Sequence, residues 1–372
     1  MKSSLIRFVL ATGLSLGLWP ATGSVQAQGA RAKQPAAILS PTPRLNPDGT
    51  LDLTRPAFGA LDLSGYTVSL DAQRGPIFSA EADATSASSP GQWLGIGTGA
   101  GPLKGQVLAL AVMGTDVFIG GSFNDAANLP AADYLVRWNG VTWSALGAAA
   151  NGDGALTSVV YALAVHGTDL YVGGSFSRVS DGSTSINAAA RIARWDGAHW
   201  FALGSNGANG PALNSTVQSI AVDAAGVVYV GGWFNNVNNN GVVVPEADYL
   251  ARWDGANWSA LGSNGVGDGA VNAVVYALHI NGGDLYAGGS FTDVNDGGVP
   301  LTAADYVARW DGAAWSALGS NGAANGAISG TIRALARFGA QLIVGGSFVN
   351  VSNHGATLGA AESQLRLGLG NL

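Results

Sequence analysis

Short segments in which hydrophobic and polar positions alternate predict β-strands along most of the chain. Residues 249–253 alternate in this way, so every second side chain falls on the same face of a strand. Asp254 and Gly255 follow and predict a tight turn, because both residue types accept the positive φ that hairpins need. Residues 258–262 return as a second strand, which completes an antiparallel hairpin.

A second predicted hairpin precedes each hairpin of this kind. Residues 160–165 and 170–176 are apolar strands on either side of a turn at residues 166–169. The later strand contains a glycine doublet, followed by one residue and then phenylalanine. One module therefore holds four antiparallel strands. The doublets are Gly120 and Gly121, Gly173 and Gly174, Gly231 and Gly232, Gly288 and Gly289, and Gly345 and Gly346.

A tryptophan motif, Arg-Trp-Asp/Asn-Gly with a second Trp three residues after the glycine, occurs four times. The second tryptophans are Trp143, Trp200, Trp258 and Trp315, so neighbouring copies are 57, 58 and 57 residues apart. A fixed period of this size is typical of a propeller or another repeat array. Four strands are the content of one propeller blade. We therefore expect an all-β propeller of four-stranded blades.

The order of these motifs resembles the kelch-type repeat of the galactose oxidase central domain. Residues 170–174 end in the glycine doublet, and residues 194–200 contain Trp-Asp-Gly and the second Trp. The resemblance is closest to secreted bacterial repeat proteins and to the fungal cortical polarity-marker propellers, and it covers roughly residues 91–368. It implies a kelch-like β-propeller. It does not imply copper chemistry, because the galactose oxidase site needs a Tyr cross-linked to Cys and this chain has no Cys.

The region before the repeats predicts a leader. Residues 1–27 have a basic start, an apolar centre and small residues at the end, which is the pattern of a secretory signal peptide. Residues 28–90 form an extension, in which alternation over residues 51–70 predicts short strands and residues 79–90 predict a linker. The extension either packs on the propeller or forms a small adapter. The propeller is expected over residues 91–372.

The two ends of the repeat region predict a closed ring. Residues 91–97 match the last strand of a module although no earlier strand precedes them. Residues 331–338, 341–348 and 364–368 supply three strands of a module that lacks its fourth. We expect residues 91–97 to complete that last blade, which gives about five blades and removes exposed sheet edges. A gene truncated at its 3′ end would leave a similar pattern.

Net charge and residue content argue against several classes of partner and of catalytic site. Removing residues 1–27, which hold two basic and no acidic residues, takes the net charge from −7 to −9. That charge disfavours nucleic acid and anionic membrane surfaces as partners. No apolar stretch is long enough to span a bilayer. The four histidines share no motif, and no Ser-His-Asp or paired-carboxylate constellation appears. We expect a secreted monomer without a cofactor and without catalytic activity.

Most of the eleven tryptophans have a structural interpretation. Burying one such ring removes about 150–250 Å² from water, so tryptophans at fixed blade positions are expected in the core rather than on a sugar-binding surface. The tryptophans with fixed positions are Trp93, Trp138, Trp143, Trp195, Trp200, Trp253, Trp258, Trp310 and Trp315.

Residues that break the repeat are the better candidates for binding. Trp233 replaces the serine found after the other doublets, and His279 stands where other modules have alanine. Arg333 and Gln218 take the place of a tyrosine. Ordinary repeat drift is the competing explanation for all four. If the first strand of each blade lines the central channel, some of these residues point towards it.

The loops predict the face that carries a site. Connections between strands 1 and 2 and between strands 3 and 4 are short, and the other connections are long, so all long loops share one face. Asp293, Asn295 and Asp296 lie in such a loop and offer oxygen ligands for calcium. The same residue types are also those that turns prefer, and turns are the favoured interpretation.

Together these patterns predict a binding or structural module at or outside the cell surface. Its partner would be a glycan or a cell-surface protein, held on the long-loop face. The alternative is a polysaccharide hydrolase or lyase on a propeller scaffold, with acids such as Asp293, Asp296 or Glu246 near the channel. Clustered carboxylates with raised pKa values would favour the enzyme.

Overall fold

The computed structural model describes residues 103–338, 341–349, 351–353, 356–358 and 364–368, together with four short strands near the N-terminus. The chain divides into two compact units, Met1–Ile96 and Gly97–Leu372. In the first unit, β1 (Ile38–Leu39) pairs in parallel with β2 (Ala60–Leu61), and β3 (Tyr66–Asp71) pairs antiparallel with β4 (Gly75–Ala80). Two of these strands fall in the predicted span 51–70. β4 extends two residues into the predicted linker.

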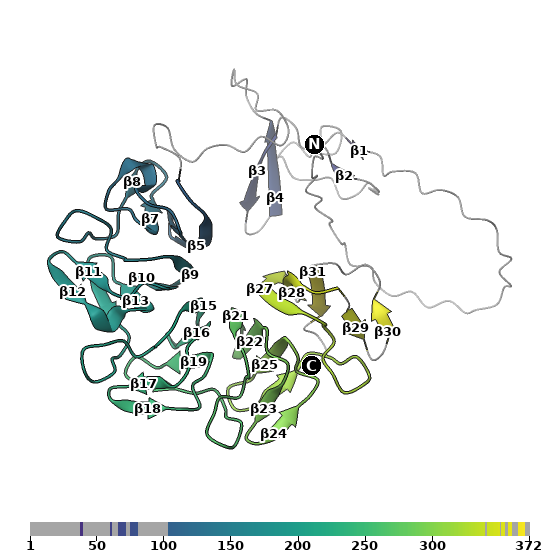
Figure 1. The fold of residues 1–372 in the computed structure, drawn as a ribbon. Coiled ribbons are helices and arrows are strands. Elements are labelled where there is room, and N and C mark those ends of the chain that lie inside the picture. The colour runs from purple at the N-terminus through teal and green to yellow at the C-terminus, as the bar shows by residue number, and fades with distance from the viewer. Residues whose placement is uncertain are drawn as a thin grey trace. The chain divides into compact units, whose positions relative to one another are not determined.

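Five antiparallel sheets make up the described part of the second unit (Figure 1). Four sheets have the predicted four strands in sequence order, and the last has three. The predicted antiparallel modules are therefore confirmed. The bounds are β5 (Val107–Met113), β6 (Asp116–Gly121), β7 (Leu135–Trp138) and β8 (Trp143–Ser144); β9 (Val160–His166), β10 (Asp169–Gly174), β13 (Ile192–Trp195) and β14 (Trp200–Ala202); β15 (Val217–Val222), β16 (Val228–Gly232), β19 (Leu250–Trp253) and β20 (Trp258–Ser259); β21 (Val275–Asn281), β22 (Asp284–Gly289), β25 (Val307–Trp310) and β26 (Trp315–Ala317); and β27 (Thr331–Phe338), β28 (Gln341–Ser347) and β31 (Gln364–Gly368).

In the second to fifth sheets, the long connection between the second and third strands contains a hairpin of its own, which the sequence analysis treated as a loop. Each of these hairpins leaves the sheet and, in the middle three sheets, packs near the fourth strand, as β23 does on β26. The hairpins are β11 (Val179–Asp181) with β12 (Thr184–Ile186), β17 (Val237–Asn239) with β18 (Val242–Val244), β23 (Val294–Asp296) with β24 (Val299–Leu301), and β29 (Val351–Asn353) with β30 (Ala356–Leu358).

The glycine doublets are required by close packing in two directions. A Cβ on Gly173 would lie 2.6 Å from Val217 Cγ1 in the next sheet. A Cβ on Gly174 would meet the carbonyl oxygen of Val159, at the point where the register with β9 shifts. The first glycine therefore lets neighbouring sheets approach, and the second lets the chain pass a β-bulge.

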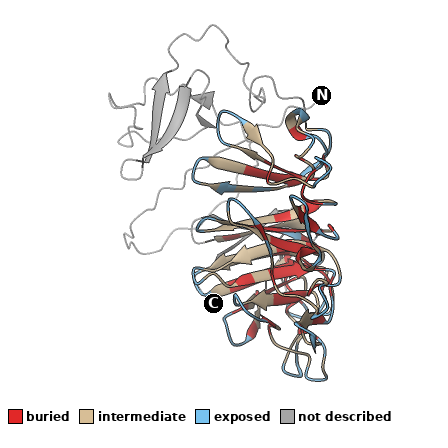
Figure 2. Ribbon diagram, turned by 90° about the vertical axis from the view of Figure 1, so that its left-hand side faces the viewer, coloured by how far each residue is buried: buried red, intermediate tan, exposed pale blue. Residues whose placement is uncertain are grey.

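The tryptophans of the motif join successive sheets, and the structural role predicted for them is confirmed where the pattern is complete. Trp200, Trp258 and Trp315 are buried, and each indole Nε1 donates a hydrogen bond to a leucine carbonyl oxygen at the end of the preceding sheet. Each also packs on the first Trp of its own motif, with ring centroids 5.2–5.4 Å apart. Figure 2 shows the buried residues concentrated within and between the sheets, with the loops exposed.

In the Asp-Gly turns, the aspartate does not have the positive φ that was predicted for both residues. Only the glycine takes a positive φ, which is 101° at Gly255. Asp254 instead accepts hydrogen bonds through Oδ1 from the backbone N–H groups of Ala256 and Asn257. The aspartate closes the turn as an Asx-type acceptor rather than by adopting the left-handed conformation.

The sheets follow one another as propeller blades do. The first strands lie innermost and contact each other in the order β5, β9, β15, β21 and β27 (Figure 1). The described strands do not close into a ring. The predicted strand 91–97 lies outside the described residues, so the sheet of β27 has three strands here. The described helices are two short 3-10 turns, η2 (Ala126–Asn128) and η3 (Asn187–Ala189), and neither has the length and hydrophobicity needed to cross a bilayer.

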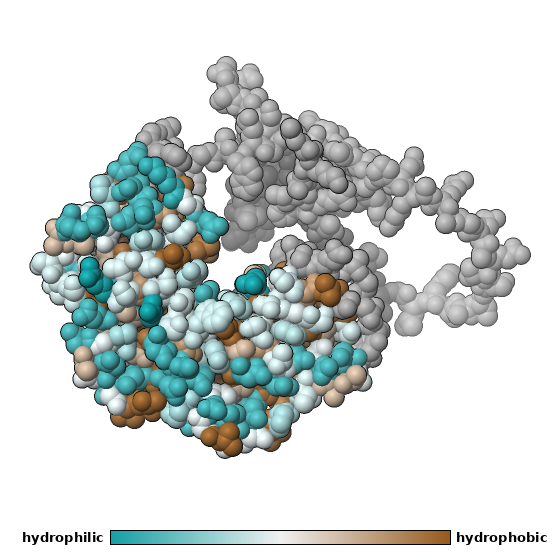
Figure 3. Space-filling model, in the orientation of Figure 1, coloured by the Kyte–Doolittle hydropathy of each residue, from teal (hydrophilic) through white to brown (hydrophobic). Residues whose placement is uncertain are grey.

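The β5 side of the first sheet is unusually apolar for an exposed surface, and hydrophobic side chains are visible there in Figure 3. Val107 is 44% exposed, whereas Val160, Val217 and Val275, at the same position in the next sheets, are fully buried. Each of those valines is covered by the sheet that precedes it. The β5 surface is therefore the face on which a preceding blade would pack.

Candidate functional site

The strand order places the candidate residues at the long-loop end of the sheets. The first strand of each sheet begins at this end and the second strand finishes there. At this end, a β-bulge interrupts the pairing between the first and second strands of each sheet. The bulge leaves one residue of the first strand without a paired residue in the second strand. We call these the bulge residues, and the row that they form the bulge row: Leu108, Tyr161, Gln218, Tyr276 and Arg333.

Three side chains from three successive sheets meet in this row. Trp233 follows β16, and its ring lies edge-on to that of Tyr276 in β21, with centroids 6.2 Å apart and planes at 76°. The guanidinium carbon of Arg333 in β27 lies 5.0 Å from the centroid of the same tyrosine ring. Trp233 is 51% exposed. The structure thus brings together two of the repeat-breaking residues, with Tyr276 between them.

His279 does not join this group. It lies in the middle of β21 opposite Tyr286, and its Nε2 is buried without a hydrogen-bond partner in the described structure. Burial, and secondarily the positive charge of Arg337, lower the pKa of His279. The imidazole is therefore neutral at neutral pH and carries no positive charge that could attract an anionic ligand.

Arg191 is a repeat-breaking residue that the sequence analysis missed. It stands where the other modules have Tyr134, Tyr249 and Tyr306, and all four residues have a positive φ. Its guanidinium donates a hydrogen bond to the carbonyl oxygen of Ser175, next to the bulge row. The sequence could have identified Arg191, because an arginine replaces the tyrosine found at this position in the other modules.

The acids named for the alternative enzyme do not form a catalytic pair. Asp293 directly precedes β23 and Asp296 ends it, and this strand packs against β26, the outermost strand of its sheet. Glu246 lies between β18 and β19 in another sheet. The placement of these acids near the channel stays a prediction.

One carboxylate does have a raised pKa. Burial raises the pKa of Asp305, and the nearby charge of Asp293 raises it further. Asp305 Oδ2 accepts a hydrogen bond from the Gly326 backbone N–H, as Asp133 Oδ2 does from Gly154. Because this contact recurs from sheet to sheet, we interpret Asp305 as a structural acid.

The side-chain oxygen atoms proposed for calcium have different surroundings. Asp296 Oδ2 accepts from the Trp315 backbone N–H at 3.4 Å. Asn295 Oδ1 is buried and has no hydrogen-bond partner in the described structure. Across the described residues, no three His, Cys, Asp or Glu side chains come close enough together to hold a metal ion.

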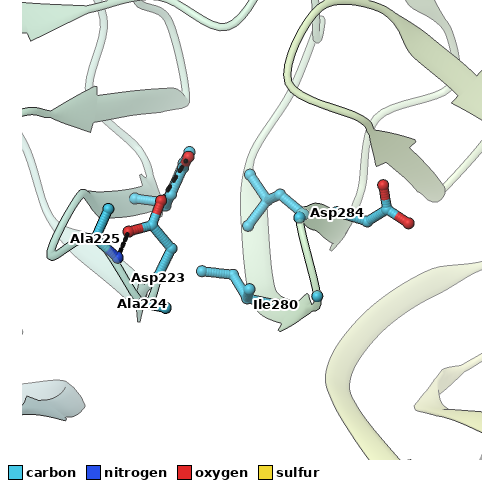
Figure 4. A pocket seen from close by; sticks show the side chains of 9 residues that line it. Asp223, Ala224, Ala225, Ile280 and Asp284 are labelled. Carbon is cyan, nitrogen blue, oxygen red and sulfur yellow. Dashed lines mark hydrogen bonds between the residues drawn. The ribbon is translucent and has the colours of Figure 1, made fainter.

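A shallow cleft of about 220 Å³ lies at the opposite, short-loop end, between the turns of the third and fourth sheets (Figure 4). Asp223 and Asp284 line it, but both carboxylates are already engaged. Asp223 accepts from the backbone N–H groups of Ala225 and Val227, and Asp284 pairs with Arg309 at 2.9 Å. Figure 4 shows the Asp284 carboxylate directed away from Asp223, so the cleft offers no pair of free acids.

Comparisons with known proteins give only distant likenesses. No protein-family model and no curated protein matches the sequence. Among solved structures, the WD40 β-propeller domain of Doa1 aligns with a TM-score of 0.38 and 11% identity, over 71% of this chain and 72% of that chain. The GH74 enzyme of Niastella koreensis aligns with a TM-score of 0.38 and 15% identity, over 73% and 36%. At these values neither likeness carries an argument, and the propeller assignment rests on the sheets of this chain.

Proposed function

We propose that this protein is a secreted, non-catalytic, kelch-like propeller module that binds a glycan through its long-loop end. The observation that carries the proposal is the half-exposed ring of Trp233 against Tyr276. A serine occupies the Trp233 position in every other module, so the fold does not require an aromatic ring there. An aromatic ring left in water is a ready surface for the C–H face of a sugar.

The open geometry fits a chain-like ligand. Trp233 and Arg333 are both exposed and come from different sheets, whereas sites for small molecules are normally enclosed and concave. A polysaccharide needs only a platform of aromatic rings and nearby polar groups. The bulge row supplies these as Tyr161, Gln218 and Tyr276.

The test is a glycan-array screen, with thin-layer analysis of each bound glycan for cleavage. Trp233→Ser restores the residue that the repeat itself uses, and we expect it to abolish binding on the array. Phe201→Ser is the matched control, because Phe201 is a 39% exposed aromatic ring beneath Arg194, and other modules have serine there. The control should bind as the wild type does.

Each result has a clear meaning. Binding that depends on Trp233 and leaves the glycan intact supports the proposal. Cleavage of the glycan would replace it with the polysaccharide hydrolase or lyase. A blank array would reject glycan binding and point to a cell-surface protein as partner.

The proposal includes ring closure and export. The match of residues 91–97 to a fourth strand, the three strands at β27 and the exposed β5 surface support a ring of five blades closed by that strand. The signal-peptide pattern of residues 1–27 supports secretion, which N-terminal sequencing of protein from the medium would test. We expect a monomer, measured by light scattering.

A further inference from the structure

We infer that the glycan bound at Trp233 is acidic, and that Arg333 binds its carboxylate groups. This inference rests on the proposed function and adds the class of ligand. It starts from the charge of the bulge row. The equivalents of Arg333 in the other four sheets are neutral, namely Leu108, Tyr161, Gln218 and Tyr276.

Arg333 differs from the arginines of the third strands. Three of the four pair with an aspartate at the start of the second strand: Arg137 with Asp116 at 2.7 Å, Arg194 with Asp169 at 2.8 Å and Arg309 with Asp284 at 2.9 Å. The fourth, Arg252, donates a hydrogen bond to Ser259 Oγ instead. Arg333 is exposed and forms no ion pair with any described residue. In a chain with a net charge of −7, this leaves a cation available at the long-loop end.

The contact with Tyr276 holds the Arg333 side chain in place while its N–H groups remain free to bind a carboxylate. The guanidinium lies over the tyrosine ring, and this contact restricts the side chain without using its N–H groups as donors. Those donors form a planar fork that matches the two oxygens of a carboxylate. A hydrogen-bonded ion pair of this kind needs little further ordering of the arginine.

The aromatic pair fixes where the sugar lies relative to that charge. The ring of Trp233 stands nearly perpendicular to that of Tyr276, so the two form an apolar corner. A pyranose ring can stack on the exposed tryptophan while a carboxylate at its edge, or on the next sugar, reaches Arg333. Because Trp233, Tyr276 and Arg333 come from three successive sheets, an oligosaccharide of uronic acids suits the site better than a monosaccharide does.

The experiment is calorimetric titration of the whole protein with an oligogalacturonate and with the same oligosaccharide after its carboxyl groups are reduced to alcohols. We expect the acidic form to bind at least about tenfold more tightly at low salt, which is the scale of one charge-assisted hydrogen bond. Arg333→Gln, which introduces the residue of the third sheet, should remove that preference, so that the variant binds the two forms equally. Arg194→Gln is the control for lost charge and should keep the preference.

The outcomes separate this inference from the proposed function. Equal binding of the two forms, lost in Trp233→Ser, would overturn the acidic ligand and keep the glycan-binding module. A preference that survives Arg333→Gln would overturn the role of Arg333. Failure to bind either form, with a blank glycan array, would overturn both proposals.

Discussion

Trp258 Nε1 donates a 2.7 Å hydrogen bond to the carbonyl oxygen of Leu203, which belongs to the preceding sheet. The same bond joins Trp200 to Leu146 and Trp315 to Leu261. Each indole thus buries an apolar ring between two sheets and satisfies a carbonyl group at the end of a strand. This contact explains why the second tryptophan is the most regular feature of the repeat.

Replacing Trp258 by phenylalanine should destabilise the protein by about 1–3 kcal/mol. The change leaves the Leu203 carbonyl buried without its donor, and an unsatisfied buried polar group costs about that much. Chemical denaturation monitored by circular dichroism measures the difference. No change in stability would mean that water replaces the indole donor.

Trp143→Phe is the informative counterpart. Trp143 Nε1 is buried but has no hydrogen-bond partner among the described residues. If the sheets do not close into a ring, Trp143→Phe should lower the free energy of unfolding clearly less than Trp258→Phe does. If the strand of residues 91–97 closes the ring, a carbonyl group becomes available and the two variants should cost the same. The pair of variants therefore tests ring closure.

The packing around the glycine doublet predicts different effects of two Gly→Ala changes on stability. A methyl group on Gly289 would meet the carbonyl oxygen of Val274, which the strand ladder holds in place, so Gly289→Ala should cost at least about 2 kcal/mol. Gly283 has open space around its Cβ position and no positive φ. Gly283→Ala should therefore leave the melting temperature unchanged or slightly raised. Equal effects of the two changes would contradict the packing argument.

The Asp-Gly turns predict an acid-sensitive part of the stability. Backbone hydrogen bonds lower the pKa values of Asp196, Asp254 and Asp311 below the usual 3.8. A lowered pKa in the folded state adds stability above pH 3.8 that is lost as the pH falls through the folded-state value. The first sheet has Asn139 in this position, and it accepts the same pair of backbone bonds without titrating.

The triple variant Asp196→Asn, Asp254→Asn and Asp311→Asn tests this directly. It should be less stable than the wild type at pH 7, because a charged acceptor makes the stronger bond. The difference should shrink as the pH falls below about 4. Melting temperatures across that range measure it, and a difference that does not depend on pH would disprove the titration.

The repeat pattern predicted the sheets well because the strands of each sheet come from one module and pair in the order in which they occur in it. It predicted Trp233 and Arg333 as candidates because they break a column of the repeat. It could not select Tyr276, since a tyrosine there is an ordinary member of its column. Their meeting depends on how one sheet follows the next, which brings the residue after one doublet against the bulge of the following sheet.

The hairpins outside the sheets were missed for a related reason. Residues such as Asn238, Asn239 and Gly241 favour turns, so the segment predicts a loop. In the structure, Val237 is fully buried and fixes the hairpin to the sheets. Asn240 donates its backbone N–H to the carbonyl oxygen of Ser205, in the connection that precedes the sheet, and its side-chain oxygen accepts from the Ser205 hydroxyl. These long-range contacts override the local preference.

For Asp305 we expect the opposite effect of an Asp→Asn change on stability at pH 7 from that expected for the turn aspartates. Because burial raises its pKa in the folded state, ionisation of Asp305 opposes folding at pH values above that raised pKa. Asp305→Asn removes this penalty and keeps an oxygen for the Gly326 N–H bond. The variant should therefore be more stable than the wild type at pH 7, and its advantage should disappear below about pH 3.8.

Asp248→Asn is the matched control for this change. Asp248 accepts from the backbone N–H of Asn236 at 2.7 Å, and Asn236 is the neutral counterpart of Asp293. Without a second carboxylate at that position, the control should gain less stability than Asp305→Asn does. A loss of stability in Asp305→Asn at neutral pH would instead mean that its charge supports the fold, and would contradict the prediction.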